Sequence, residues 1–257
     1  MIESLAVLCG KSMLATETQQ IRDVSGVGIP MSSLQKSGMV QAWGAAGRAL
    51  IAGYVDSYTL LHFGVYASFM SGNTTSAGLH VGKDRLAAAA HSLFPIPFFV
   101  LGIFVGTLLM HTDRHHGLTR LSALVAAMLT SGTVVAFFAW PGWVSILVLS
   151  AAMGIMNTSI THVGGQAVSL GFVTGDLNYL GQHLAMGIKR APVRQLQGPW
   201  DTHWMRAALL AGIWTAFFMG AVLGAALAAR LASWSLLLPA LLLVVFAPLD
   251  RAAISSV

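Results

Sequence analysis

Residues 69–76 of the chain read FMSGNTTS, and residues 172–179 read FVTGDLNY. Each stretch places an aromatic and an apolar residue before a small hydroxyl residue, a glycine and an Asn or Asp. Polar runs of this kind stand out in a chain that is otherwise strongly apolar. Their recurrence after about a hundred residues indicates an internal duplication, the first clue to the fold.

The composition places the chain in a lipid bilayer. Of the 257 residues, 56% are hydrophobic and only 9% are charged, whereas soluble domains carry about 25% charged residues. The fourteen Lys and Arg residues lie between apolar runs and form no basic block interleaved with aromatics, so no nucleic-acid partner is expected. The bilayer is the expected partner, and the single cysteine, Cys9, cannot form an intramolecular disulfide.

Six apolar runs are long enough to approach the roughly 20 residues that a helical span needs. They centre on residues 45–65, 88–110, 118–140, 143–163, 204–228 and 231–249. The two polar stretches between them are too short and polar for independent spans. We therefore predict an all-α transmembrane helical bundle with six full spans and two short or partial helices. Eight spans are the alternative.

The duplication extends beyond the polar stretches. A Gly-x-x-Asp/Asn helix precedes each stretch, and a Gly-x-x-x-Gly helix follows it. These pairs are Gly53 with Asp56, Gly154 with Asn157, Gly102 with Gly106, and Gly220 with Gly224. Residues 41–140 and 141–257 are thus predicted to be two tandem repeats. The Gly-x-x-x-Gly pairs are expected to pack helices within the protomer.

Residues 1–40 form a more polar extension, for which we predict a flexible cytoplasmic tail. A membrane-surface helix, or a true start at Met39, is the alternative. Positive charges near span ends favour the cytoplasm. With six spans, Lys83, Arg85 and Arg230 face outward, both termini are cytoplasmic, and the repeats are inverted. With eight spans the repeats are parallel, and the charge balance is equally good.

A polar turn at membrane depth is tolerated only where it is buried or lines a wet cavity. Paired interruptions in two repeats point to a transporter's central site. Ser71 and Thr174 are expected to be N-caps, which would leave Gly72, Asn73, Gly175 and Asp176 in the first turns of short helices. The predicted substrate-binding residues are Asp56, Ser71, Gly72, Asn73, Thr74, Asn157, Thr174, Gly175 and Asp176.

Asp56 is the main candidate among them, because an ionisable group within an apolar helix usually marks an ion or proton path. The alternative is a structural carboxylate bound by Ser57, Tyr58 or Thr59. Its counterpart, Asn157, is neutral, so the predicted site is electrically asymmetric.

No catalytic motif is present, so no enzymatic activity and no cofactor are expected. His111, His115 and His116 lie in HTDRHHG, which we interpret as a solvated loop rather than a metal site.

The stretches GYVDSY…FMSGNTTSAGL, FVLGIFVG and GIMNTS…GFVTGDLNYLG together resemble the YoaK family, a domain-of-unknown-function family of bacterial inner-membrane proteins. The resemblance covers residues 45–250 and implies a polytopic protein of the bacterial inner (plasma) membrane. Ser71 replaces an expected threonine, and Asp176 replaces a residue that is more often neutral.

The leading hypothesis is a secondary transporter or permease for a small solute or ion. The alternative is a non-transporting membrane scaffold or sensor. The solute and the oligomeric state are not predicted.

Overall fold

The structure is a computed structural model that describes residues 31–112, 117–160, 162–163, 165–169, 171, 173–193 and 201–254. Almost all of these residues are helical, as the sequence predicts. The helices are α2 (Met31–Phe63), α3 (Met70–Val81), α4 (Leu86–Leu93), α5 (Pro95–Thr112), α6 (Gly117–Phe137), α7 (Gly142–Asn157), α8 (Val173–Ile188), α9 (His203–Leu231), the 3-10 helix η1 (Ala232–Leu236) and α10 (Leu237–Ile254). A small antiparallel hairpin of β1 (His162–Val163) and β2 (Gln166–Ala167) separates α7 from α8.

Three helical stretches among the described residues are long and apolar enough to cross a membrane: Leu86–His111, Gly117–Phe137 and His203–Phe246. The third contains two of the predicted spans, which η1 separates. Two of the predicted spans are not among these three stretches. The run at 45–65 is helical but contains the charged residues Arg48 and Asp56. The run at 143–163 forms a shorter apolar helix that ends at Asn157.

The predicted amino-terminal extension also differs from expectation over its last residues. Helix α2 begins at Met31, so residues 31–40 continue the first helix of the bundle. Residues 1–30 lie outside the described part of the chain, as do residues 113–116 of the predicted histidine loop.

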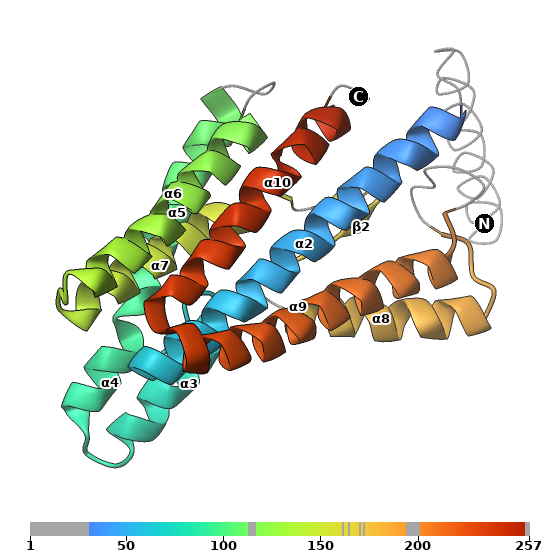
Figure 1. Cartoon of the computed structure of the whole chain (residues 1–257). Helices are drawn as coiled ribbons and strands as arrows, with labels where there is room; N and C mark the ends of the chain where they lie inside the picture. The colour runs from blue at the N-terminus through green and yellow to red at the C-terminus, as the bar shows by residue number, and fades with distance from the viewer. Residues whose placement is uncertain are drawn as a thin grey trace.

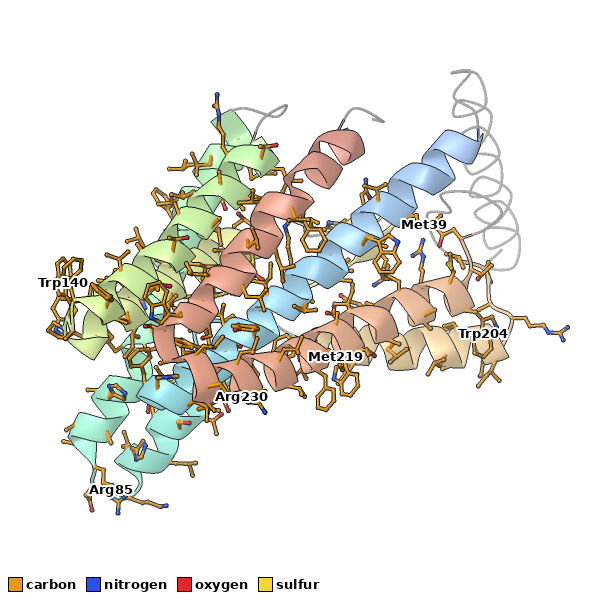
Figure 2. All side chains as sticks on the ribbon, in the orientation of Figure 1. Met39, Arg85, Trp140, Trp204, Met219 and Arg230 are labelled. Carbon is orange, nitrogen blue, oxygen red and sulfur yellow. The ribbon has the colours of Figure 1, made fainter. Side chains whose placement is uncertain are left out.

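The helices form two packed groups that share α2 (Figure 1). Helices α5, α6, α7 and α10 lie together, and their buried side chains pack with those of α2 around Leu121, Leu149 and Leu243. On the other side of α2, α9 runs beside α8, with a smaller apolar cluster around Ala49 and Leu210. Helices α3 and α4 form a separate hairpin that carries Arg85 (Figure 2).

The outer surface of the bundle is apolar, as a lipid-facing surface requires. Long apolar side chains stand exposed on α5, α9 and α10, including Phe104, Met219 and Val244, and Figure 2 shows Met219 pointing away from α9. Trp140 and Trp143, at the turn between α6 and α7, and Trp234, in η1, are also exposed. Tryptophan at such turns is typical of the interface between lipid and water.

The repeated spacing of glycines brings helix backbones into contact, and the contacts have a regular pattern. A Cβ atom on Gly53 of α2 would strike the carbonyl oxygen of Phe217 on α9, and one on Gly220 would strike the carbonyl oxygen of Leu50. Helices α7 and α5 meet in the same way, because a Cβ on Gly154 would strike the carbonyl oxygen of Phe99.

The remaining glycines of the motifs complete this pattern. Gly102 faces the carbonyl oxygen of Ala151, while Gly106 and Gly224 face the backbones of Ile155 and Tyr54. The Gly-x-x-x-Gly pairs therefore pack helices inside one protomer, as predicted. Each pair belongs to one half of the sequence and contacts the Gly-x-x-Asp/Asn helix of the other half.

Two pairs of helices, α6 with α10 and α2 with α7, run antiparallel. Thr133, near the end of α6, donates a hydrogen bond to the carbonyl of Ser233, just before α10, at 3.1 Å. Gly142, at the start of α7, faces the ring of Phe63, at the end of α2. The end of the first member of each pair thus lies beside the start of the second.

Candidate functional site

The carboxylate of Asp56 organises the turn that follows α2. Asp56 lies in the helix interior, and its Oδ1 accepts a hydrogen bond from the backbone N–H of Ser68 at 2.7 Å. Its Oδ2 accepts a second hydrogen bond from the hydroxyl of Ser68, also at 2.7 Å. The backbone N–H groups of Ala67 and Phe69 also lie near this carboxylate. A buried carboxylate is tolerated because these donors replace water.

The partner of Asp56 differs from those considered in the sequence. Ser57, Tyr58 and Thr59 are the partners expected from spacing, yet the carboxylate bonds to Ser68, twelve residues further along the chain. The hydroxyl of Thr59 donates instead to the backbone carbonyl of Asp56 at 3.2 Å. The side chain therefore ties α2 to the start of the polar stretch rather than to its own helix.

The predicted N-caps are wrong. Helix α3 begins at Met70, with Phe69 at the N-cap position and no side-chain capping bond, and α8 begins at Val173. Ser71 and Thr174 therefore lie inside the first turns and are exposed. Thr74 is exposed as well, and its hydroxyl donates to the carbonyl of Met70 at 2.9 Å.

The last residues of the two motifs, Asn73 and Asp176, hold the turns in place. The side-chain oxygen of Asn73 accepts from the backbone N–H of Tyr66 at 2.9 Å, and its amide nitrogen donates to the carbonyl of Tyr66 at 2.7 Å. Asp176 Oδ1 accepts from the backbone N–H of Ser169 at 3.1 Å. Both side chains reach back seven residues, and both residues are only 1% exposed.

The glycines of the motifs, Gly72 and Gly175, lie in the first turns of α3 and α8. A Cβ atom on Gly72 would strike the rings of Phe69 and Tyr66, so this glycine makes room for aromatic side chains. Gly175 is partly buried in the first turn of α8.

The two halves of the chain meet at Ser68 and Gly171. A Cβ atom placed on Gly171 would lie 3.3 Å from both Cβ and Oγ of Ser68, and 3.6 Å from Oδ1 of Asn157. Since Ser68 also binds Asp56, the structure gathers Asp56, Ser68, Asn157 and Gly171 in the interior. Of the nine predicted site residues, Asp56 and Asn157 belong to this group, which we call the central cluster.

Ser68 and Gly171 are missed by sequence reasoning because they precede the motifs that stand out. The signal that could have found them is their register, since each stands one residue before the motif's aromatic residue. The central cluster can offer a carboxylate, a hydroxyl and an amide to a small polar ligand.

Buried Arg48 is not among the predicted site residues. Its guanidinium donates to the hydroxyl of Ser122 on α6 at 3.0 Å and to the carbonyl of Gly44 at 3.3 Å. An arginine inside an apolar run is itself a signal of function or of a specific internal partner. Here it ties α2 to α6.

A second polar group, also missed, joins the hairpin, α8 and α9. Arg206 binds Asp201 through two hydrogen bonds of 2.8 and 2.7 Å and reaches the carbonyl of Gly165. His183 lies 2.6 Å from Gln166 Oε1, and its Nδ1 lies 2.8 Å from Nδ1 of His203. Burial, helped by the neighbouring His203 and Arg206 charges, holds the pKa of His183 below its usual range.

The described residues contain no cluster of side chains that could bind a metal ion. Within the ranges that the structure covers, no three His, Cys, Asp or Glu residues come close enough to hold an ion. His115 and His116 of the predicted loop lie outside those ranges.

Comparison with known protein families matches most of the chain. Residues 45–249 match the family described as "Protein of unknown function (DUF1275)". The chain is 33% identical over 203 residues to the UPF0700 transmembrane protein RA0705 of Rhizobium meliloti (strain 1021), covering 76% of this chain and 80% of that protein. It is 30% identical over 135 residues to the UPF0700 transmembrane protein YoaK of Bacillus subtilis (strain 168), covering 50% and 60% of the two chains. No solved structure matches.

Proposed function

The chain belongs to the DUF1275 family of transmembrane proteins, and from that premise we propose that it is a secondary transporter for a small solute or ion. In this proposal the chain works as a carrier, without enzymatic chemistry, in the inner membrane of a bacterium. Its two halves are inverted repeats, and the central cluster of Asp56, Ser68, Asn157 and Gly171 is the solute site.

The reciprocal glycine contacts support the repeats. The pair Gly53 and Phe217 has its counterpart in Gly154 and Phe99, with the same atoms approaching each other. The contacts of Gly220 and Gly224 with α2 likewise correspond to those of Gly102 and Gly106 with α7. The seven-residue bonds of Asn73 and Asp176 match as well. Contacts at equal sequence offsets are what a duplicated chain is expected to have.

The helix directions favour inverted rather than parallel repeats. Helices α2 and α7 correspond to each other, as do α6 and α10, and the members of each pair run antiparallel. Inversion requires an odd number of spans per repeat, so we retain six spans with α3 and α8 as partial helices. Figures 1 and 2 support the orientation, since Arg85 and Arg230 lie toward the end opposite the C-terminus. Both termini would then be cytoplasmic.

The observation that carries the proposal is the contact of Ser68 with Gly171. These residues come from corresponding turns of the two halves, and both are buried. Many transporters place their site where two interrupted segments meet at the interface of repeats. A movement of the turn before α8 relative to the turn after α2 would change the distance between these residues, and so expose the cluster to either side in turn.

A reversible cross-link between the two turns tests the proposal. In a Cys9→Ser background, Ser68→Cys and Gly171→Cys would place two thiols on Cβ atoms 3.3 Å apart, close to the range of a disulfide. We expect oxidation to join the turns and to abolish currents from reconstituted protein on a solid-supported membrane. Reduction should restore those currents. The probes are a panel of small inorganic anions, alkali cations, amino acids and carboxylates.

The single-cysteine variants are the matched controls, because they make the same side-chain changes without a cross-link. Asp56→Asn should insert normally and lose the currents, since it alters the charge of the cluster. Wild-type protein that gives no current with any probe, or a fully cross-linked protein that keeps its currents, would contradict the proposal. Either result would favour the scaffold or sensor.

A further inference from the structure

Asp176 has a buried carboxylate oxygen without a partner among the described residues. Its Oδ1 accepts from the N–H of Ser169, but Oδ2 is buried and has no hydrogen-bond partner in the part of the chain that the structure describes. An unpaired buried carboxylate oxygen is costly, so its presence calls for a ligand or a proton.

The other half of the chain shows what the position requires. Asn73 stands at the corresponding place and makes two bonds to the residue seven positions earlier. Its oxygen accepts from that residue's N–H, and its amide nitrogen donates to that residue's carbonyl. An aspartate can make the first bond as a carboxylate. It can make the second only as a carboxylic acid, because the second oxygen must then donate.

We propose that Asp176 is a proton-binding site whose Oδ2–H donates to the backbone carbonyl of Ser169. This inference rests on the transporter function proposed above, in which this proton is the coupling ion. The proton is released to water and bound again as the first turn of α8 moves. The protonated Asp176 side chain makes the same two hydrogen bonds as the amide of Asn73. The turn of the first half therefore has both bonds at all times, and the turn of the second half has both only when Asp176 is protonated.

The surroundings favour a proton over a metal cation. Ca²⁺ and Mg²⁺ take about six or more oxygen ligands, whereas Oδ1 already faces an N–H donor. The other titratable and charged groups that the structure describes in α8, α9 and the adjoining segments are His162, Tyr179, His183, Lys189, Arg190, Asp201, His203, Arg206 and Arg230. His183 and His203 bind each other, and Arg206 binds Asp201. Within the described ranges, the only group acting on the Asp176 carboxylate is Ser169.

Infrared difference spectroscopy of the full-length protein in detergent tests this site without any solute. A titration from about pH 8 to about pH 5 stays above the range of unperturbed aspartates. We expect the carbonyl band of a protonated carboxylic acid to grow as pH falls and to lose its Asp176 component in Asp176→Asn. Asp56→Asn is the control for the other buried carboxylate and should keep the band. Sodium or magnesium at constant pH should not displace it.

A gain-of-site variant sharpens the test. Asn73→Asp puts an acid into the geometry of the corresponding turn and should add a second titrating band. The proposal is overturned if wild-type protein shows no such band, or if the band is undiminished in Asp176→Asn. Failure here is distinct from failure of the transporter. A protein with the band and no solute currents keeps the proton site, and one with currents and no band loses only this site.

Discussion

The hydrogen bonds between Asp56 and Ser68 show how one side chain can fix a polar turn in an apolar environment. The carboxylate takes up donors that would otherwise be left without water, and the turn thereby acquires a defined shape. At the same time these bonds occupy the group that a solute would use. A solute with its own donors could replace the Ser68 hydroxyl without leaving the carboxylate unpaired.

A double-mutant cycle measures this interaction at the scale of residues. Ser68→Ala removes the hydroxyl donor, and Asp56→Asn removes the charge. We expect each single change to destabilise the protein and the pair to be coupled by about 0.5–2 kcal/mol, the range found for side-chain bonds within membranes. Unfolding in mixed micelles, followed by tryptophan fluorescence, gives the free energies. Strict additivity would mean that the hydroxyl contributes nothing beyond the backbone donors.

At this scale, the sequence predicts which side chains are unusual but not what they bind. Asp56 is conspicuous because it interrupts an apolar run, whereas Ser68 looks like any serine near a turn. The bond between them depends on how the chain folds back after α2. Here Gly64 adopts a positive φ of 70°, a conformation that favours glycine. Spacing alone does not encode that path.

The close approach of helices at glycine is the main packing feature at the scale of elements. Helix α9 contains glycines in both crowded and open surroundings, which makes it suitable for a matched comparison. A Cβ atom on Gly220 would strike the backbone of Leu50 on α2, while one on Gly212 would meet nothing within 4 Å.

We expect Gly220→Ala to destabilise the protein by about 1–3 kcal/mol, because the added methyl group forces α2 and α9 apart. Gly212→Ala should be neutral or stabilising by up to about 1 kcal/mol, because alanine is the better helix former. The same unfolding assay compares the two. Equal effects would show that helix propensity, rather than the approach of backbones, dominates at both positions.

Helix positions are largely predictable at this scale, and helix ends are not. Long apolar runs leave a chain in lipid few choices besides a helix, so α5, α6 and α9 match expectation closely. The starts of α3 and α8 are predicted at Ser71 and Thr174 because hydroxyl residues are favoured N-caps. Instead Asn73 and Asp176, two residues further along, anchor the residues seven positions earlier.

At the scale of the whole molecule, the helices of the two sequence halves are exchanged. Helix α2 packs closely on α9, and α7 packs closely on α5. The order of motifs predicts a duplication, yet it does not distinguish pairing within a half from pairing between halves. Identical glycine patterns serve both arrangements equally well, so this feature required the structure.

Separate expression of fragments 1–140 and 141–257 tests whether the helices of the two halves depend on each other for packing. Expressed alone, each should insert but be degraded or aggregate, because its glycine-lined helix lacks a partner. Expressed together, they should co-purify through a tag on one fragment. Adding Gly53→Leu to the first fragment should abolish this assembly, since a bulky side chain blocks the approach of α9. Stable, monomeric single fragments would argue against exchanged packing.

The contact of α2 with α9 also has a consequence for biosynthesis. Ribosomes release the chain from its amino terminus, so α2 enters the bilayer well before residues 203–231 have been translated. Throughout that interval the face of α2 that contains Gly53 contacts lipid or an insertion factor instead of α9. Arg48 and Asp56 enter the membrane before the bundle around them is complete. Maturation is therefore complete only when the last quarter of the polypeptide arrives, and late truncations should expose the earliest helix to quality-control proteases.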